Sequence, residues 1–194
     1  MLEVTSNYFV ITCNDINREI ENMKNKILRG MICSVQQSEN IDLEMVVTMV
    51  VLMFFNEFEP CSLLSFYQIL FPNLKGKELV LQFLCDVQSE RLHKLRYYDS
   101  CHNGWIMVHK DLPHYFINED GFVWSIDWIN ANEGVPKDDD LYLIQDDLGN
   151  IGTAYLNPSI SSKFIKFTSY TVYFTDVKKW ADIKPIGVCY ECFK

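Results

Sequence analysis

The sequence predicts an α+β fold, in which a helical first half packs on an antiparallel, β-rich second half. Apolar residues recur at helical spacing up to about residue 91, whereas short aromatic-rich segments separated by Gly, Asn and Asp follow from about residue 112. Because no low-complexity linker separates the halves, we expect two domains, residues 1–111 and 112–194, that pack together.

The composition excludes several classes of protein. The 194 residues are 48% hydrophobic and 22% charged, which is typical of a globular rather than a disordered chain. The longest apolar run, residues 45–55, is too short to cross a bilayer, and no secretory signal opens the sequence. Seven cysteines without an export signal are expected to be reduced. We therefore expect a cytoplasmic protein without membrane contact.

The first predicted helix spans residues 14–30. Residues 7–12 have the weak alternation of a short strand, and a polar link follows the helix at residues 34–42. Asn14 or Asp15 can cap the helix and Gly30 can end it. Four apolar side chains fall on one of its faces: Ile16, Ile20, Met23 and Ile27.

A second predicted helix, residues 43–58, is apolar on nearly every face. Such a helix is either buried between layers or covered by a partner, and the sequence leaves both alternatives open. Under the second alternative, Phe54 and Phe55 are candidate partner contacts.

Two shorter helices and a β-hairpin follow. Pro60 separates the preceding helix from residues 61–72, where Leu64, Tyr67 and Phe71 are expected to face inward. A further helix is predicted at residues 76–91, and two strand-like segments, 93–98 and 105–110, flank a turn signal at Asn103-Gly104.

Three helices followed by a hairpin resemble a winged-helix domain over residues 43–110. The order of elements is the whole of this resemblance, because winged helices have no diagnostic motif. It implies that the helix at 76–91 stands where a DNA-binding member keeps its recognition helix. Winged-helix modules also dock other proteins, as in the small accessory subunits of chromosome-organising ATPase complexes.

The polar face of the helix at 76–91 argues against DNA recognition. A recognition helix needs cations or amides toward base edges and few acids beside phosphates. On a helical wheel the polar arc holds Glu78, Gln82, Asp86 and Ser89. The opposite arc is apolar and wide, which makes Leu81 and Leu92 further candidate partner contacts.

Cations gather beyond this helix, around the predicted wing. Residues 75–110 carry a net charge of +2 within a chain of net charge −9. An acidic chain gains no general attraction to phosphates, so any DNA contact would depend on this local patch. The candidate DNA-binding residues are Lys75, Lys77, Arg91, Lys94, Arg96 and Lys110.

Six short strands are predicted in the second half, at residues 114–117, 121–126, 141–147, 152–156, 163–167 and 170–174, with a further hairpin turn at 146–150. Residues 128–186 are similar to a small β domain of unknown function that is common in phages and prophages. The similarity rests on Trp128, Ile129, Pro136, the strand 141–144, Trp180 and Pro185. It implies no mechanism, but points to the biology of mobile elements or phage defence.

The sequence contains only partial matches to known chemical sites. Cys189 and Cys192 have the spacing of half a zinc site, but two further ligands would have to come from far away. Asp176 and Lys178 match half of a metal-dependent nuclease motif, with Asp140 or Asp147 as an additional acid. The five carboxylates at 138–140 and 146–147 are better explained as solvated hairpin ends. No nucleophile elbow or phosphate-binding glycine loop is present.

These observations favour a non-enzymatic accessory or regulatory protein that acts through a protein partner and needs no cofactor. It would be a subunit of a larger complex or a protein of phage–host conflict. The alternatives are a winged-helix regulator that contacts DNA through the wing and, less well supported, a metal-dependent nuclease.

Overall fold

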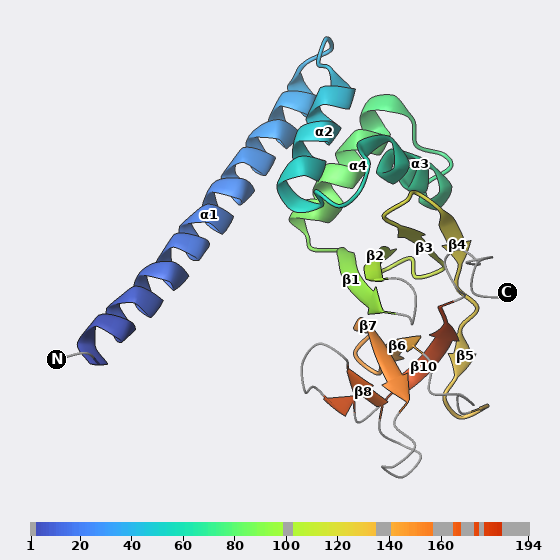
Figure 1. The fold of residues 1–194 in the computed structure, drawn as a ribbon. Coiled ribbons are helices and arrows are strands. Elements are labelled where there is room, and N and C mark those ends of the chain that lie inside the picture. Colours follow the sequence, from blue (N-terminus) through green and yellow to red (C-terminus); the bar gives the residue numbers. More distant parts are fainter. Residues whose placement is uncertain are drawn as a thin grey trace, which may run out of the picture.

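The computed structural model describes residues 3–98, 103–134, 141–156, 165–167, 173–174 and 177–183. The predicted α+β class is confirmed, because the helices of the first half precede two antiparallel sheets. The described helices are α1 (Glu3–Gln37), α2 (Leu43–Phe54), α3 (Pro60–Leu70) and α4 (Gly76–Gln88). Helices α2, α3 and α4 gather into one body, from which α1 projects (Figure 1).

Helix α1 is longer than the sequence predicted. The strand expected at residues 7–12 is wrong, because these residues belong to the helix. Gly30 does not end it either, and the helix continues for two more turns to Gln37. Those turns bury Ile32 and Val35 against the body together with Leu28. The packing of three large apolar side chains outweighs the cost of about 1 kcal/mol for a glycine inside a helix.

The first sheet is four-stranded, in the order β1 (Leu92–Tyr98), β2 (Asn103–His109), β3 (Tyr115–Asn118) and β4 (Val123–Ser125). The hairpin expected over residues 93–110 is formed by β1 and β2, but Asn103-Gly104 begins β2 rather than forming the turn. Since β3 pairs with β2, the predicted domain boundary at residue 111 falls between two neighbouring strands of one sheet.

The second sheet is six-stranded, in the order β5-β10-β6-β7-β8-β9. Its strands are β5 (Ile129–Asn130), β6 (Leu141–Asp146), β7 (Ile151–Leu156), β8 (Ile165–Phe167), β9 (Tyr173–Phe174) and β10 (Val177–Asp182). Strand β10, which lies between β5 and β6, was not predicted from the sequence. The predicted turn at 146–150 is present, with Gly149 at φ +83° and the Asp146 carboxylate accepting from the Asn150 backbone N–H at 2.7 Å.

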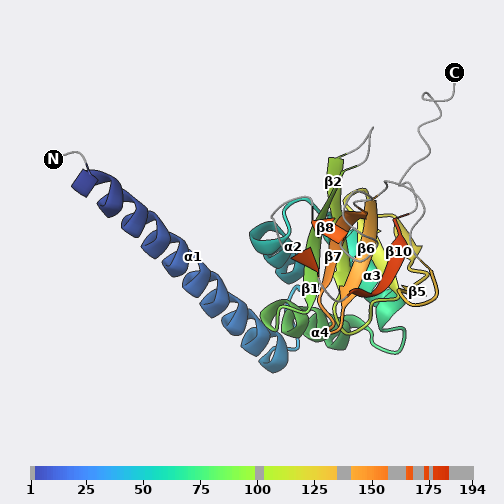
Figure 2. The same ribbon diagram turned by 90° about the horizontal axis from the view of Figure 1, so that it is seen from below.

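The four-stranded sheet lies between the helices and the six-stranded sheet (Figures 1 and 2). Because strand side chains alternate between faces, Met107 and Ile117 pack with the helices. Their neighbours Ile106, Val108 and Phe116 pack with β6, β7 and β10. A hydrogen bond of 2.9 Å from Thr153 Oγ1 to the Arg96 carbonyl joins the two sheets.

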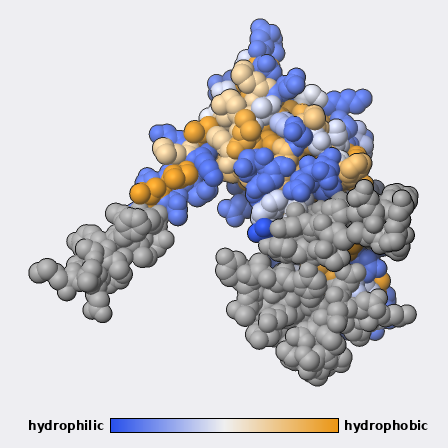
Figure 3. All heavy atoms as spheres, viewed as in Figure 1, coloured by the Kyte–Doolittle hydropathy of each residue, from blue (hydrophilic) through white to orange (hydrophobic). Residues whose placement is uncertain are grey.

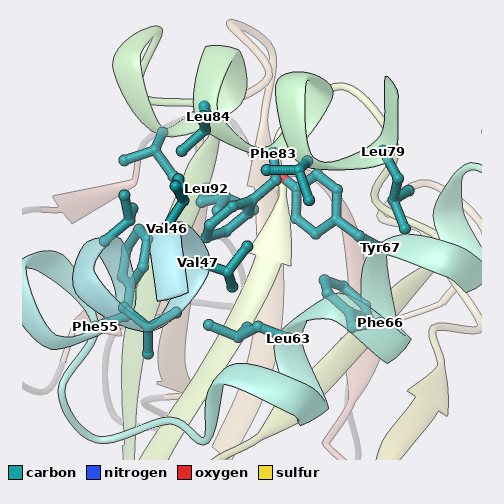
Figure 4. Packing of buried hydrophobic residues seen from close by; sticks show 14 of the residues in the cluster. Val46, Val47, Phe55, Leu63, Phe66, Tyr67, Leu79, Phe83, Leu84 and Leu92 are labelled. Atoms are coloured by element: carbon teal, nitrogen blue, oxygen red, sulfur yellow. The ribbon is translucent and has the colours of Figure 1, made fainter. Parts of the chain in front are cut away.

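The main core lies between the helices and this first sheet. Figure 4 shows valines of α2, the aromatic side chains Phe66, Tyr67 and Phe83, and Leu92 converging in it. Tyr67 packs edge-on against Phe83, with ring centroids 5.1 Å apart. Tyr67 is fully buried as the sequence predicted, whereas Leu64 and Phe71 are half-buried at its edge.

Candidate protein-docking surface

Helix α2 has two apolar faces, and only one of them is buried. Val46, Val47, Val50 and Val51 lie in the main core. On the opposite face Met45, Met49 and Leu52 are 46–65% exposed. The Asp42 carboxylate caps the helix by accepting from the Met45 N–H at 3.0 Å. The core interpretation of this helix therefore holds for one face, and the other face is open.

These three residues, which we call the α2 row, were not among the partner contacts that the sequence analysis named. Phe55 and Leu92 are buried in the main core, and Phe54 and Leu81 are half-buried at its margin. The chain itself therefore engages these four side chains. The missed signal was the spacing of Met45, Met49 and Leu52, whose steps of four and three residues place them on one side of a helix.

A pocket of about 340 Å³ opens beside this helix. It lies where the first turns of α2, α3 and α4 meet, and its lining residues are Leu43, Glu44, Val47, Pro60, Cys61, Leu64, Gly76, Leu79 and Val80. Glu44 is the only charged residue among them. Its lining residues from α2 lie on the other side of that helix from the α2 row, so the pocket is a separate hollow, large enough for one apolar side chain.

Helix α1 carries a further line of exposed apolar side chains, the α1 stripe, formed by Ile16, Ile20, Met23 and Ile27. Each of the four is at least 40% exposed. Figure 3 shows orange residues along α1 and more of them over the helical end of the body on the same side of the molecule. Isolated exposed apolar residues are ordinary on a protein surface, but aligned ones mark interaction sites.

Several of the candidate DNA-binding cations are already engaged within the chain. The Lys94 ammonium lies 2.8 Å and 2.9 Å from the two Glu57 oxygens and 4.6 Å from the centre of the Trp105 ring. Arg91 lies between Asp86 at 3.4 Å and Asp111 at 3.3 Å. Lys77 donates to the carbonyls of Gln36 and Ser38, at the end of α1.

The other three candidates are Lys75, Arg96 and Lys110. Lys75 and Lys110 are exposed, and the Arg96 guanidinium lies 5.6 Å from the centre of the Trp105 ring. Cations that bind their own chain contribute less to a phosphate-binding surface, because their charge is partly neutralised. Lys77, Arg91 and Lys94 instead hold α1, the end of α4 and β1 to neighbouring elements.

The polar arc predicted for α4 is wrong at Asp86, which is fully buried. Its carboxylate accepts from Tyr67 Oη at 3.3 Å and from Gln82 Nε2 at 3.0 Å, and it lies 3.2 Å from His109 Nε2. Burial would raise the pKa of Asp86, but hydrogen bonds from His109 and Gln82 outweigh it, so the pKa stays below its ordinary value. The aspartate is therefore ionised inside the protein.

His109 cannot act as a general base in this cluster. Its Nδ1 accepts hydrogen bonds from the backbone N–H groups of Asp111 and Leu112, both at 3.2 Å. With Nδ1 accepting, the proton of the neutral ring is on Nε2, where it is donated to Asp86. Burial, followed by the nearby Asp86 charge, raises the pKa of Tyr67 far above its ordinary value, so its hydroxyl stays protonated. The cluster holds α3, α4 and β2 together.

Most of the proposed metal and nuclease residues lie in parts of the chain that the structure does not describe. Cys189, Cys192, Asp176 and Asp140 lie outside the described residues, as does Pro136 of the second resemblance. Lys178 is exposed, and its carbonyl accepts from Ala131 within the sheet. Within the described ranges no three His, Cys, Asp or Glu side chains are placed to hold a metal ion.

Searches against protein-family models, curated proteins and solved structures found no match to this chain. In the described part of the chain, no helix has both the length and the apolar character needed to cross a membrane. The α2 row is thus the most developed candidate site in the described structure.

Proposed function

We propose that this chain is a non-enzymatic accessory or regulatory protein that acts by docking another protein through the α2 row. The observation that carries the proposal is the α2 row itself. Three large apolar side chains stand exposed in line on a helix whose other face is fixed in the core. A helix anchored in this way presents them on a rigid scaffold, which lowers the entropic cost of binding.

The partner surface that fits is apolar at its centre and basic at its edge. Its apolar centre would cover the α2 row, and a Lys or Arg at its edge would lie beside the exposed Glu44, which precedes Met45 in the sequence. Residues 1–74 carry a net charge of −5, which would speed the approach of a basic partner. A subunit of a larger complex and a target in phage–host conflict are both compatible with this surface.

DNA binding through the β1–β2 hairpin is the second candidate. The exposed Lys75 and Lys110 favour it, whereas the ion pairs of Arg91 and Lys94 oppose it. A catalytic role has less support, because the buried cluster around Asp86 leaves no free nitrogen on His109.

The proposal is tested by affinity purification of the full chain from its native host, with the recovered proteins quantified by mass spectrometry. We expect the Met49→Glu/Leu52→Glu variant to lose a partner that wild type recovers. Leu148→Glu is the matched control, because Leu148 is the most exposed large apolar residue described and lies in the β6–β7 turn. Equal recovery of every partner by wild type and the double variant would contradict the proposal.

A further inference from the structure

The α1 stripe has the spacing of a coiled-coil seam. Its residues follow one another in steps of four, three and four, from Ile16 through Ile20 and Met23 to Ile27. Alternating steps of three and four define a heptad, in which Ile20 and Ile27 take position a while Ile16 and Met23 take position d. The sequence continues the same steps at Cys13 and Phe9, ahead of the residues whose side chains are described.

The stripe is also narrow, as a seam between two helices is. A helix that lies on a globular body shows a broader apolar face, which includes position e or g as well. Here position e holds Asn17 and Lys24, and position g holds Glu19 and Lys26. The polar flanks therefore favour a second helix rather than a broad surface as the cover of the stripe.

The charges at these flanking positions fit a second copy of the same chain. In a parallel two-stranded coiled coil, the residue at g faces position e of the other strand, five residues further on. Glu19 of one copy would then face Lys24 of the other, and Lys26 would face the uncharged Met31. No like charges meet in this register. In the single chain Lys24 contacts Glu21 of its own helix at 3.1 Å and lies 5.5 Å from the centre of the Phe54 ring of α2, so the coiled coil would replace these contacts.

The α1 stripe lies on a different side of the helix from the face that docks on the body. Helix α1 docks on the body through Leu28, Ile32 and Val35, whose face is turned about 120° from the α1 stripe. A second helix on the stripe would therefore leave the docked face of α1 in place. Twofold symmetry would place the two bodies on opposite flanks of the coiled coil, at the same end.

We propose that α1 pairs with α1 of a second copy in a parallel, two-stranded coiled coil, with Ile20 and Ile27 at its a positions. The isoleucines fit, because β-branched residues at position a favour two parallel strands. The dimer would present two α2 rows at one end. This inference goes beyond the docking of a partner and stands independently of it.

Sedimentation equilibrium of the full chain tests the proposal. We expect wild type to be a dimer at micromolar concentration, and Ile20→Glu to raise the dissociation constant at least about 100-fold by burying two facing carboxylates in the seam. Asn25→Glu is the matched control, because it adds the same side chain on the opposite, exposed face of α1. Circular dichroism of each variant checks that it is folded.

A charge exchange tests the parallel register. Glu19→Lys should raise the dissociation constant about 3- to 10-fold by placing two lysines together, and adding Lys24→Glu should restore it. In an antiparallel pair Glu19 would face Lys26 instead, so Lys26→Glu would be the substitution that restores binding. That result would overturn the proposed register. A wild-type chain that stays monomeric at about 100 µM would overturn the coiled coil itself. A dimer unaffected by Ile20→Glu would overturn it as well. If affinity purification recovered a different helical protein in an α1-dependent way, the α1 stripe would belong to that protein instead.

Discussion

Asp86 shows how a single residue can fasten three elements of this fold. Its buried carboxylate receives hydrogen bonds from α3 through Tyr67, from α4 through Gln82, and from β2 through His109. Arg91 adds a charge at 3.4 Å. A buried ion pair is not in itself evidence of stability, but removing one partner leaves the others unsatisfied in a medium that solvates them poorly.

We expect Asp86→Ala to lower the free energy of unfolding by about 3–5 kcal/mol, because it leaves Tyr67, Gln82 and His109 without their shared acceptor. Asp111→Ala is the control, since Asp111 also contacts Arg91 but is more than half exposed. Its effect should stay below about 1 kcal/mol. Urea unfolding followed by circular dichroism measures both, and equal effects would show that the cluster does not act as a buried anchor.

The ionisation of Asp86 predicts how the stability of the fold depends on pH. The pKa of Asp86 is lower in the folded chain than its ordinary value of 3.8. The ionised carboxylate therefore contributes fully to the free energy of unfolding above pH 3.8, and this contribution is lost as the pH falls through the folded pKa. The difference in unfolding free energy between wild type and Asp86→Asn should be constant from about pH 7 to pH 5 and shrink below about pH 4. A difference that grew toward low pH would contradict the assigned ionisation.

At the scale of elements, the two faces of α2 should respond differently to truncation. Val50 is fully buried, so Val50→Ala should cost about 2–3 kcal/mol of unfolding free energy through lost methyl groups and the cavity left behind. Met49→Ala, one residue away on the exposed face, should change stability by less than about 0.5 kcal/mol. Thermal unfolding of both variants checks this pair, and a large cost at Met49 would place its side chain in a packed environment.

The turn between β3 and β4 meets α3 closely at Gly121. This residue has φ +85°, and an added Cβ would lie 2.5 Å from Ser62 Oγ. Gly149 in the β6–β7 turn has a similar φ of +83° but open space around it. Both alanine variants should be destabilised by about 1 kcal/mol from backbone strain, and Gly121→Ala by roughly 1–3 kcal/mol more from overpacking. Equal losses in denaturant unfolding would show that Ser62 moves aside freely.

Periodicity predicted most elements but not what covers them. The pattern of Val46, Val47, Val50 and Val51 is enough to predict a helix with a buried face. In α1 the most regular apolar pattern is exposed, and the docked face begins only at Leu28. The spacing of residues defines a helix face, whereas its partner depends on contacts between segments distant in the sequence. The same limit explains Asp86, which lies on a polar arc yet faces Tyr67 and His109.

For the whole molecule, the arrangement of layers makes the β1–β2 hairpin part of a packed sheet. One face of that sheet meets the helices and the other meets the second sheet. The chain has a net charge of −9, and carboxylates pair with Arg91 and Lys94. Little positive surface therefore remains on the hairpin. The order of α2, α3, α4, β1 and β2 could be predicted from the sequence. The ion pairs of the cations could not, because side-chain pairing follows from tertiary contacts.

We therefore expect duplex DNA to bind with a dissociation constant above about 100 µM at physiological salt, at the weak end of non-specific binding. Fluorescence anisotropy with a labelled duplex measures it, and Arg96→Ala should leave the weak signal unchanged. Micromolar binding that falls steeply with salt and is lost in Arg96→Ala would support the DNA-binding alternative instead.

The most direct measurement of the central claim is the dissociation constant of the full chain for the partner that affinity purification recovers. The proposed docking surface predicts at least a tenfold increase in this constant for Met49→Glu/Leu52→Glu, because two carboxylates would be buried against an apolar surface. Leu148→Glu should leave it unchanged. An identical constant for wild type and the double variant would show that the partner binds elsewhere and would contradict the account.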